Sequence, residues 1–435
     1  MADVRRGARF RYEGWSWEGT GALRCDYSLD GRGFTERIVF QNAADTTPAV
    51  DAAARLVFLL AGISYYKTAA PPVIDTGDHA LTDLERDFLR QYYVQGLGEF
   101  AYRNGMLAEL QDLVVDGPSR LPQAVTAVAA SSRPLVPFGG GIDSLVVLEQ
   151  VRARHADTAL FVASRAGARF EAIETALQAT GLPVRRADRE VDGQVLRSRE
   201  LGLLNGHVPV TGILSSMAVT AALLDGRDAV VMSNEWSASA STVVVDGIPV
   251  NHQWSKSEDF EVRFREVLAE SLPGMSYSSA LRPFSELWVA DRFAHLEQYH
   301  LVFRSCNRAF HLDPALRWDR WCGECDKCCF IDLILAPFLD RTRLEKIFDG
   351  REPLARQDLV ARFRALLGDP THEKPFECVG DEDECRVAVL MASARPDRAD
   401  SSLLQQLAAE VRTAGWETSP PERLLAPLSS APAAT

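Results

Sequence analysis

The chain has 435 residues, of which 46% are hydrophobic and 25% are charged, and its formal net charge is -13 at neutral pH. This length exceeds what one ordinary hydrophobic core serves, so it predicts two or three domains. The acidic balance disfavours polyanionic partners such as DNA, tRNA or an anionic membrane surface. It leaves open small phosphorylated substrates, which a few arginines and backbone amides can hold.

The first residues and the apolar stretches of the chain bear on the cellular location of the protein. The first residues, MADVRRGARFRYEGW, contain basic side chains but no apolar run after them, so they do not form a secretory signal. The longest apolar stretches, AVTAALLDG and FIDLILAPFL, are short for a membrane span. We therefore expect a cytoplasmic protein with no membrane span, whose 8 cysteines are thiols or metal ligands rather than disulfides.

Residues 1–130 are predicted to form a mixed α/β amino-terminal domain. Apolar and polar residues alternate from about residue 7 to 45, and the Asp-Gly pair in LDGRGF joins two such runs. This combination is typical of an antiparallel hairpin. Helical periodicity follows in VDAAARLVFLLAG and in LTDLERDFLRQYYVQGLGEF.

Residues 131–345 alternate short apolar strands with helical segments. The strands RPLVPF, TALFVAS, PVRRADRE and DAVVMSNE are separated by helical patterns such as ARFEAIETALQATG and TGILSSMAVTAALLDG. Such alternation predicts an α/β fold with a doubly wound parallel sheet and helices on both faces. Ligands gather at the carboxyl ends of such strands, which here carry Gly139 to Ser144, Ser164-Arg165 and Ser233 to Glu235. Residues 346–418 are predicted to be helical, and 419–435, biased to Pro, Ala and Ser, are predicted to form a disordered tail.

A glycine-rich loop stands between the first of these strands and its helix. The residues are Gly139, Gly140, Gly141, Ile142, Asp143 and Ser144. Three glycines let the backbone turn sharply and approach a ligand, and the helix start then presents free N–H groups to a phosphate. Ser144 can add a hydroxyl donor, and Asp143 can cap the turn or help to hold magnesium. The alternative is a glycine turn capped by Asp143 or Ser144 without any ligand.

The loop resembles the pyrophosphate loop of the N-type ATP pyrophosphatases (the PP-loop superfamily), whose pattern is Ser-Gly-Gly-x-Asp-Ser. Gly140, Gly141, Asp143 and Ser144 match this pattern, and Gly139 replaces its first serine. No Gly-Lys-Ser/Thr follows, so the loop is not of the Walker type. The resemblance implies a PP-loop fold, ATP as substrate with magnesium, and transfer of AMP to a carboxylate or similar oxygen.

Four cysteines have a spacing typical of a metal site. Cys322, Cys325 and Cys328 lie at C-x2-C-x2-C, and Cys306 lies sixteen residues before the first of them. Four thiolates from two short segments suit tetrahedral zinc, which would be structural. An iron–sulfur cluster and a group of buried free thiols are the alternatives. The adjacent Cys329 is expected to point away, and Cys25, Cys378 and Cys385 receive no role.

Further polar residues of this region are candidates for proton transfer or substrate binding. His207, in NGHVP, precedes a predicted helix, and His252 and Lys256 lie in the polar run NHQWSKS, shortly after Glu235. An incidental loop histidine and an exposed polar surface are the alternatives. Arg304, after the apolar LVF, is a candidate for phosphate or carboxylate binding, as is Ser164.

Several segments together resemble one family, the bacterial UDP-muramoyl dipeptide epimerases (MurL). They are RFRYEGW, VPFGGGIDSLVV, NGHVPVTGILSSMA, VMSNEWSAS, VNHQWSKS and WCGECDKCCFIDLILAPFL. The resemblance runs to about residue 390. It implies an enzyme of peptidoglycan precursor synthesis that converts the terminal L-Glu of UDP-MurNAc-L-Ala-L-Glu to D-Glu through an acyl-adenylate, releasing AMP and diphosphate.

For this activity we predict catalytic roles for His207, His252, Lys256 and Glu235, with His207 as the leading base because imidazole titrates near neutral pH. Nucleotide binding falls to the glycine loop, Ser164 and Arg304. Two alternatives stay open. One is a deazaguanine-type nitrile synthase, an enzyme class with a similar cysteine pattern, or another PP-loop adenylating ligase. The other is a non-catalytic nucleotide sensor. The sequence does not indicate an oligomeric state.

Overall fold

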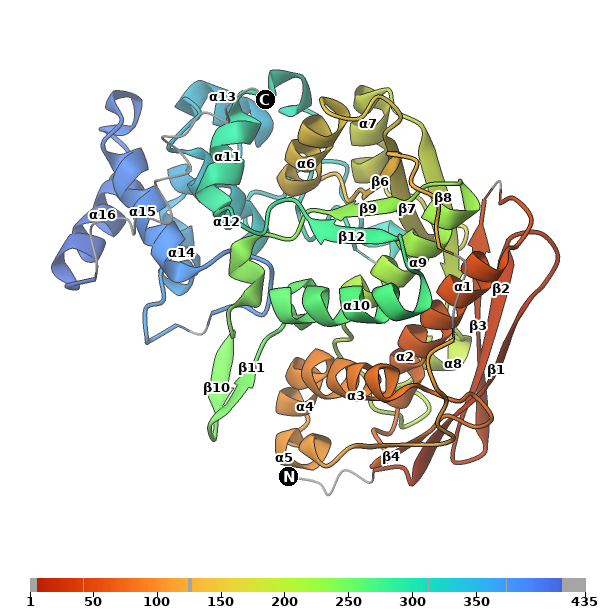
Figure 1. Cartoon of the computed structure of the whole chain (residues 1–435). Helices are drawn as coiled ribbons and strands as arrows, with labels where there is room; N and C mark the ends of the chain where they lie inside the picture. Colours follow the sequence, from red (N-terminus) through yellow and green to blue (C-terminus); the bar gives the residue numbers. More distant parts are fainter. Residues whose placement is uncertain (1–5, 42, 124–126, 312, 373, 417–435) are drawn as a thin grey trace.

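The computed structural model describes residues 6–41, 43–123, 127–311, 313–372 and 374–416. The predicted disordered tail, 419–435, lies outside the described residues. A single 10-stranded sheet has the order β12-β9-β6-β7-β8-β3-β2-β1-β4-β5 and runs through the molecule (Figure 1). Its strands are β1 (Arg9–Trp17), β2 (Ala22–Leu29), β3 (Arg32–Phe40), β4 (Val73–Asp75), β5 (Val114–Asp116), β6 (Pro134–Pro137), β7 (Ala159–Arg165), β8 (Val184–Glu190), β9 (Ala229–Met232) and β12 (Ser276–Ser279).

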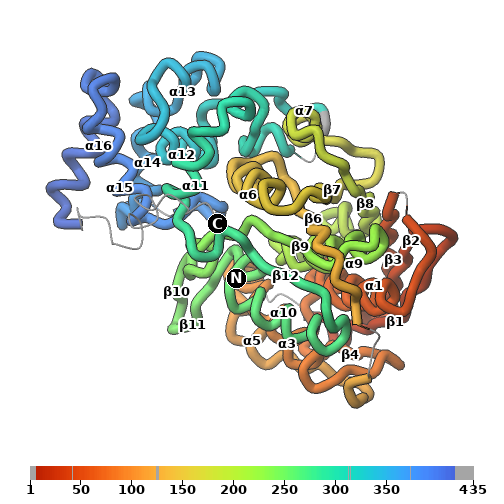
Figure 2. Tube along the Cα trace, turned by 45° about the horizontal axis from the view of Figure 1, so that its top comes forward, coloured from red at the N-terminus to blue at the C-terminus, as the bar shows by residue number. Residues whose placement is uncertain are grey.

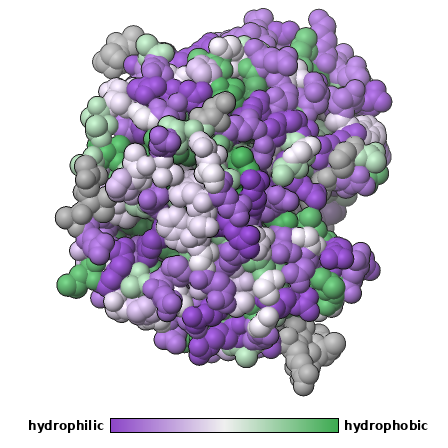
Figure 3. Space-filling view, turned by 90° about the vertical axis from the view of Figure 1, so that its right-hand side faces the viewer, coloured by the Kyte–Doolittle hydropathy of each residue, from purple (hydrophilic) through white to green (hydrophobic). Residues whose placement is uncertain are grey.

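The amino-terminal strands form the predicted hairpin. β2 and β3 pair antiparallel, and the turn residues Asp30 and Gly31 both have positive φ, as an Asp-Gly hairpin turn requires. β1 pairs with β2 but its register shifts between Tyr12 and Gly14. The extra residue of this bulge moves the inward face from even to odd positions, so that Phe10 and Tyr12 are followed by Trp15 and Trp17. Seen from the side of this hairpin, the surface is mostly hydrophilic, with small and scattered hydrophobic patches (Figure 3).

The predicted α/β fold with helices on both faces of a sheet is present, but the whole sheet is mixed rather than parallel. β9, β6, β7 and β8 run parallel, as predicted, and β12, a strand that was not predicted, pairs parallel with β9 at the edge of the sheet. β8 then pairs antiparallel with β3 through residues 37–40 and 187–190, so the hairpin extends the same sheet. Local sequence patterns do not encode such a pairing between distant strands.

The two faces of the parallel strands pack against two separate hydrophobic cores. Leu135, Ala159 and Phe161 face one core, together with α1 (Pro48–Ala61) and α9 (Val210–Leu224). The alternate residues Val136, Leu160 and Val162 face the other core. That second core contains α6 (Ile142–Arg152), α7 (Glu171–Thr180), α11 (Glu286–Ala294) and α12 (Asp326–Leu335). Strands buried on both faces explain the continuous apolar runs in the sequence.

The remaining helices complete the amino-terminal part and form a carboxy-terminal group. α2 (Ile63–Tyr66), α3 (Asp83–Gly96), α4 (Gly98–Arg103), α5 (Leu107–Gln111) and α10 (Glu258–Ser271) lie beside the first core. α13 (Arg341–Ile347), α14 (Val360–Leu366), α15 (Glu382–Ser393) and α16 (Ser402–Thr413) pack around α12, on the side away from the hairpin (Figures 1 and 2). The predicted helical character of this region is therefore present.

One helical run is longer and more apolar than the sequence analysis allowed. α1 and α2 follow one another directly, and together Pro48–Tyr66 has 19 residues with a mean hydropathy of 1.4. By length and composition this run could cross a membrane. Of the apolar window within this run, however, 78% is buried inside the protein. The core helix of a globular protein has the same composition.

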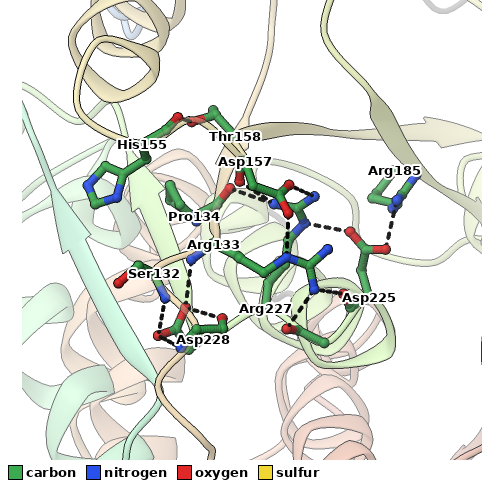
Figure 4. A network of polar contacts seen from close by, with 12 residues as sticks. Ser132, Arg133, Pro134, His155, Asp157, Thr158, Arg185, Asp225, Arg227 and Asp228 are labelled. Carbon is green, nitrogen blue, oxygen red and sulfur yellow. Dashed lines mark hydrogen bonds and ion pairs between the residues drawn. The ribbon is translucent and has the colours of Figure 1, made fainter.

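A polar network connects the amino ends of the central strands (Figure 4). It lies at the edge of the sheet opposite to the carboxyl ends of the strands, where the glycine loop lies. The guanidinium of Arg227, which is 1% exposed, donates to Asp225 at 2.5 Å and to the Asp157 carboxylate at 2.9 Å. The carboxylate of Asp228 accepts backbone N–H bonds from residues 131–133 and the hydroxyl of Ser131. Burial opposes the charge of Asp228, but these hydrogen bonds prevail and hold its pKa well below the ordinary value.

Asp228→Ala is expected to lower the free energy of unfolding by about 2 kcal/mol at neutral pH, because it leaves several donors without their charged acceptor. A depressed pKa stabilises the fold above the ordinary pKa of aspartate, so the difference from wild type should shrink as pH falls below about 4. Urea unfolding at a series of pH values measures this difference. The exposed Asp45→Ala is the control, and an equal loss in both variants would contradict the assignment.

Candidate functional site

The order of the parallel strands creates a crevice between β6 and β9. The chain proceeds from β6 to β7 and β8 on one side and then returns to β9 and β12 on the other. Ligands of such sheets bind at this reversal, outside the carboxyl ends of the strands. A cavity of about 290 Å³ lies there. Its lining consists of Gly139, Gly141, Ile142, Asp143, Ser144, Ser233, Glu235, Lys256, Glu286, Arg304, Ser305, Asn307, Phe310, Lys327, Phe330, Ile331 and Cys378.

The glycine loop forms the floor of this cavity, between β6 and α6. Gly140 has a φ of +77°, and a Cβ there would lie 3.3 Å from the carbonyl oxygen of Ala172, so glycine is required. Among the described residues, and apart from each glycine and its two chain neighbours, no atom lies within 4 Å of the positions that a Cβ would take at Gly139 and Gly141. A ligand can therefore approach the backbone at the start of α6, where the helix N–H groups and dipole favour an anion.

Asp143 and Ser144 occupy the first turn of α6. The hydroxyl of Ser144, which is 4% exposed, donates to the carbonyl oxygen of Gly141 at 3.0 Å. Oδ1 of Asp143 is buried and has no hydrogen-bond partner among the described residues. A buried carboxylate oxygen without a donor is costly unless a cation or a ligand satisfies it. This oxygen therefore fits the predicted magnesium contact.

Negative and positive side chains are concentrated around the loop. Burial, and secondarily the nearby Glu235, raise the pKa of Asp143 to about 7. Burial and the same carboxylates raise the pKa of Glu286, which is 4% exposed, well above its ordinary value. Two lysines, Lys256 and Lys327, line the same cavity and oppose the shift at Asp143. Carboxylates with raised pKa values in a polar cavity are typical of sites for cations and catalysis.

Arg304 lies in the wall of the cavity, whereas Ser164 does not line it. The backbone N–H of Arg304 donates to the carbonyl oxygen of Gly140 at 3.2 Å, and its Nη1 donates to the carbonyl oxygen of Phe303 at 2.7 Å. Nε of Arg304 is buried without a partner among the described residues, which leaves a donor for a ligand. Ser164 is 8% exposed and is the last residue but one of the adjacent strand β7. Its predicted contact with the nucleotide stays a prediction.

Glu235 and Lys256 reach the cavity from two neighbouring segments. Glu235 follows β9, and Lys256 ends the short 3-10 helix η2 (Trp254–Lys256). Arg282 joins these segments, because its Nη1 donates to the carbonyl oxygen of Glu235 at 2.9 Å and its Nη2 to that of Lys256 at 2.7 Å. Nζ of Lys256 donates to Sγ of Cys378 at 3.2 Å. The structure thus brings two of the predicted catalytic residues to the glycine loop.

His207 and His252 lie together, but they do not line this cavity. Nδ1 of His252 lies 2.6 Å from Oε2 of Glu99, and Nδ1 of His207 lies 3.5 Å from the same oxygen. The two imidazole centroids are 4.5 Å apart. Burial, and secondarily the neighbouring His252, lower the pKa of His207 to about 4, so this imidazole is neutral at physiological pH. Glu99 is hydrogen-bonded to His252 and lies near His207, and the ligand atoms of the three side chains lie within 4.8 Å of one another, close enough to hold a metal ion.

The four predicted cysteine ligands converge. The sulfur atoms of Cys306, Cys322, Cys325 and Cys328 all lie within 4.8 Å of one another. The backbone N–H of Cys322 points at Sγ of Cys306 and that of Cys325 at Sγ of Cys322, both at 3.4 Å. Gly323 turns between them with a φ of +70°. Cys329 is outside the group, as expected. The arrangement is compatible with a structural zinc ion.

Comparison with known proteins identifies the family. A family model described as the MurL N-terminal domain matches residues 1–280, and one described as the MurL C-terminal domain matches residues 302–421. The chain belongs to the MurL family. A relative from Xanthomonas oryzae pv. oryzae is 39% identical over 90% of this chain and 87% of its own length. One from Salinispora tropica is 36% identical over 98% of this chain and 93% of its own length. Both relatives are named UDP-N-acetyl-alpha-D-muramoyl-L-alanyl-L-glutamate epimerase.

Membership of the MurL family accounts for the amino-terminal residues that a nitrile synthase would leave unexplained, since a MurL domain covers them. Sequence analysis missed several residues of the site. Glu99, Glu286 and Lys327 lie in ordinary helical patterns, and Cys378 was given no role. Only their convergence in three dimensions distinguishes them from other helix and loop residues.

Proposed function

We propose that this protein is an ATP-dependent epimerase that converts the terminal L-Glu of UDP-MurNAc-L-Ala-L-Glu to D-Glu in peptidoglycan precursor synthesis. The proposal rests on the cavity at the β6–β9 reversal, whose floor is a glycine loop suited to phosphate. The names of relatives that match most of the chain support the substrate. The predicted cytoplasmic location and domain boundaries stay predictions.

Adenylation explains why an epimerase needs ATP. Removal of an α-proton next to a free carboxylate would give a doubly charged enolate, which is very costly. Transfer of AMP to the carboxylate gives a mixed anhydride, whose enolate carries one negative charge fewer and can be stabilised by hydrogen-bond donors. Return of a proton from the opposite face inverts the centre, and water then hydrolyses the anhydride to release AMP.

The residues of the cavity fit the nucleotide half of this reaction. We assign phosphate binding to the amides of Gly139, Gly140 and Gly141 and to the hydroxyl of Ser144, in the manner of the PP-loop superfamily. Arg304 and the two lysines add positive charge for diphosphate. Asp143 and Glu235 are the residues that would hold magnesium, which when bound neutralises phosphate charge. The zinc proposed at the four cysteines has a structural role.

We assign one of the two proton transfers to the histidine pair. Glu99 orients His252 through the 2.6 Å contact, and the neutral imidazole of His207 can accept a proton. His252 lies on the segment that continues into η2, whose last residue, Lys256, lines the cavity. In this assignment Lys256 binds the substrate carboxylate and Glu235 binds the metal, and neither residue acts as a base.

Turnover in deuterated water tests the epimerase proposal. Wild-type protein with ATP, magnesium and the L-Glu precursor should give D-Glu that carries deuterium at the α-carbon, and both inversion and exchange should require ATP. Chiral analysis of hydrolysed product and mass spectrometry measure the two outcomes. ATP consumption without inversion of glutamate would refute the epimerase assignment and leave only an adenylating enzyme.

His207→Ala should still release AMP but should exchange the α-proton at least about a hundredfold more slowly, the usual scale of general acid–base catalysis. His155→Ala, a histidine of the loop after α6, is the matched control. If His207→Ala exchanges the proton at the wild-type rate, proton transfer belongs only to groups that line the cavity.

A further inference from the structure

The α-carbon of the substrate is bonded directly to the carboxyl carbon that receives AMP. A base for the α-proton must therefore reach that carbon when the carboxylate is seated at the glycine loop. His252 precedes the cavity-lining Lys256 by four residues, but neither histidine lines the cavity. A second proton-transfer group, for the opposite face, is thus to be sought among the side chains that line it.

Most ionisable groups of the lining are unsuited to this task. Burial opposes the charge of Lys256, but nearby negative groups raise its pKa above the ordinary value, so its ammonium cannot accept a proton. The carboxylates of Asp143 and Glu286 are buried and lie close to other carboxylates, and Asp143 lies in the first turn of α6, where the nucleotide phosphates would be held. Glu235 is assigned to the metal, and Lys327 and Arg304 are assigned to diphosphate. Cys378 therefore remains among the groups that line the cavity.

Positive charge surrounds Cys378. Nζ of Lys256 donates to its Sγ at 3.2 Å, and Nζ of Lys327 donates to its backbone carbonyl oxygen. Cys378 is half-buried, so it is accessible from the cavity, whereas Cys385 nearby in the sequence is 2% exposed. An adjacent ammonium and partial exposure are typical surroundings of a reactive cysteine.

The same short segment also contacts the histidine pair. The ring of Phe376 packs edge-on against His252 with centroids 6.2 Å apart, two residues before Cys378. On the facing segment, His252 and Lys256 are separated by three residues. These two segments therefore place a thiol and an imidazole at two ends of one wall of the site.

We propose that Cys378, whose sulfur accepts a hydrogen bond from the ammonium of Lys256, is one of the two proton-transfer residues of this epimerase, and that the histidine pair serves the opposite face. This inference rests on the proposed function. The neutral imidazole takes the α-proton: the C–H bond breaks, an N–H bond forms, and the electron pair moves through the new C=C bond to the carbonyl oxygen. The enolate then collapses as its α-carbon takes the proton of the Cys378 thiol on the other face, and the electron pair of the S–H bond stays on the sulfur beside the ammonium of Lys256. The imidazolium then gives a proton to solvent and the sulfur takes one from solvent, which restores both groups.

Cys378→Ala, Cys378→Ser and the control Cys385→Ala test the inference on the full-length protein. Cys378→Ala should release AMP and diphosphate within about threefold of the wild-type rate, while inversion of glutamate falls at least about a hundredfold. Each protein is incubated in deuterated water with ATP and either the L-Glu or the D-Glu precursor. Loss of one proton-transfer group should leave deuterium entering only one of the two epimers. If alanine unfolds the protein, the serine variant, of nearly the same size, gives the same readouts.

Alkylation supplies a readout besides activity. At neutral pH iodoacetamide should modify Cys378 of the wild type about tenfold faster than in Lys256→Gln, because the adjacent ammonium stabilises the negative charge on the attacking sulfur. Peptide mass spectrometry separates this cysteine from the others. Inversion by Cys378→Ala at the wild-type rate, or an equal fall in AMP release and inversion, would overturn the inference while leaving the epimerase standing. Failure of the wild type to invert glutamate would instead refute the proposed function.

Discussion

Asp143→Ala is expected to lower AMP formation by at least about a hundredfold while the fold persists. Oδ1 of Asp143 is buried beside the glycine loop without a partner among the described residues, so its role is toward a ligand rather than toward the fold. Loss of one preorganised polar group that stabilises charge developing in the transition state lowers the rate by about this factor. Ser144→Ala should have a similar effect, because its hydroxyl lies in the cavity at the start of α6. Quantifying AMP by liquid chromatography, with ATP and magnesium in excess, measures both effects.

The exposed Asp87→Ala is the control for loss of a carboxylate, and thermal unfolding controls for the fold. Asp143→Asn separates charge from shape: if the carboxylate holds magnesium, the amide should be as inactive as alanine at low magnesium and recover partly at high magnesium. Near-normal AMP release from Asp143→Ala and Ser144→Ala together would place the nucleotide elsewhere.

The loop and the cysteine group could be predicted because local backbone and ligand chemistry constrain their residues. Gly140 needs a positive φ next to a carbonyl oxygen, and the spacing of Cys322, Cys325 and Cys328 alone suits one metal ion. The Asp-Gly hairpin of residues 22–40 could be predicted from the sequence for the same reason. The hairpin of β10 (Val243–Val245) and β11 (Ile248–Val250) was not predicted, although Asp246-Gly247 carries the same signal.

What the sequence did not reveal depends on contacts between distant residues. The pairing of β3 with β8, which merges the hairpin into the main sheet, has no local signature. Neither has the approach of Glu99 to His252, across 153 positions of the chain, or that of Lys256 to Cys378, across 122. A cysteine at an unremarkable position becomes a candidate for catalysis only when an ammonium and a cavity are seen beside it.

The cysteine group joins two parts of the cavity wall, and this gives the second large expected effect. Cys306 directly follows Arg304 and Ser305, and α12, which begins after Cys325, carries Lys327 and Phe330, all of which line the cavity. If zinc holds these segments together, the purified protein should contain about one zinc per chain, and Cys325→Ser should lose it. Because binding energy of a structural metal is largely folding energy, this variant should also lose several kcal/mol of stability and nearly all AMP formation.

Cys329→Ser is the matched control, since Cys329 is adjacent to Cys328 and equally buried but lies outside the group. It should keep its zinc, measured by plasma mass spectrometry after purification under reducing conditions. Iron and sulfide in place of zinc would indicate the iron–sulfur alternative. If the wild-type protein contains no metal, and if treatment with a chelator changes neither its activity nor its stability, the four cysteines are free thiols. In that case the packing of Trp321 against Phe303, whose ring centroids lie 5.1 Å apart, would have to hold the two segments instead.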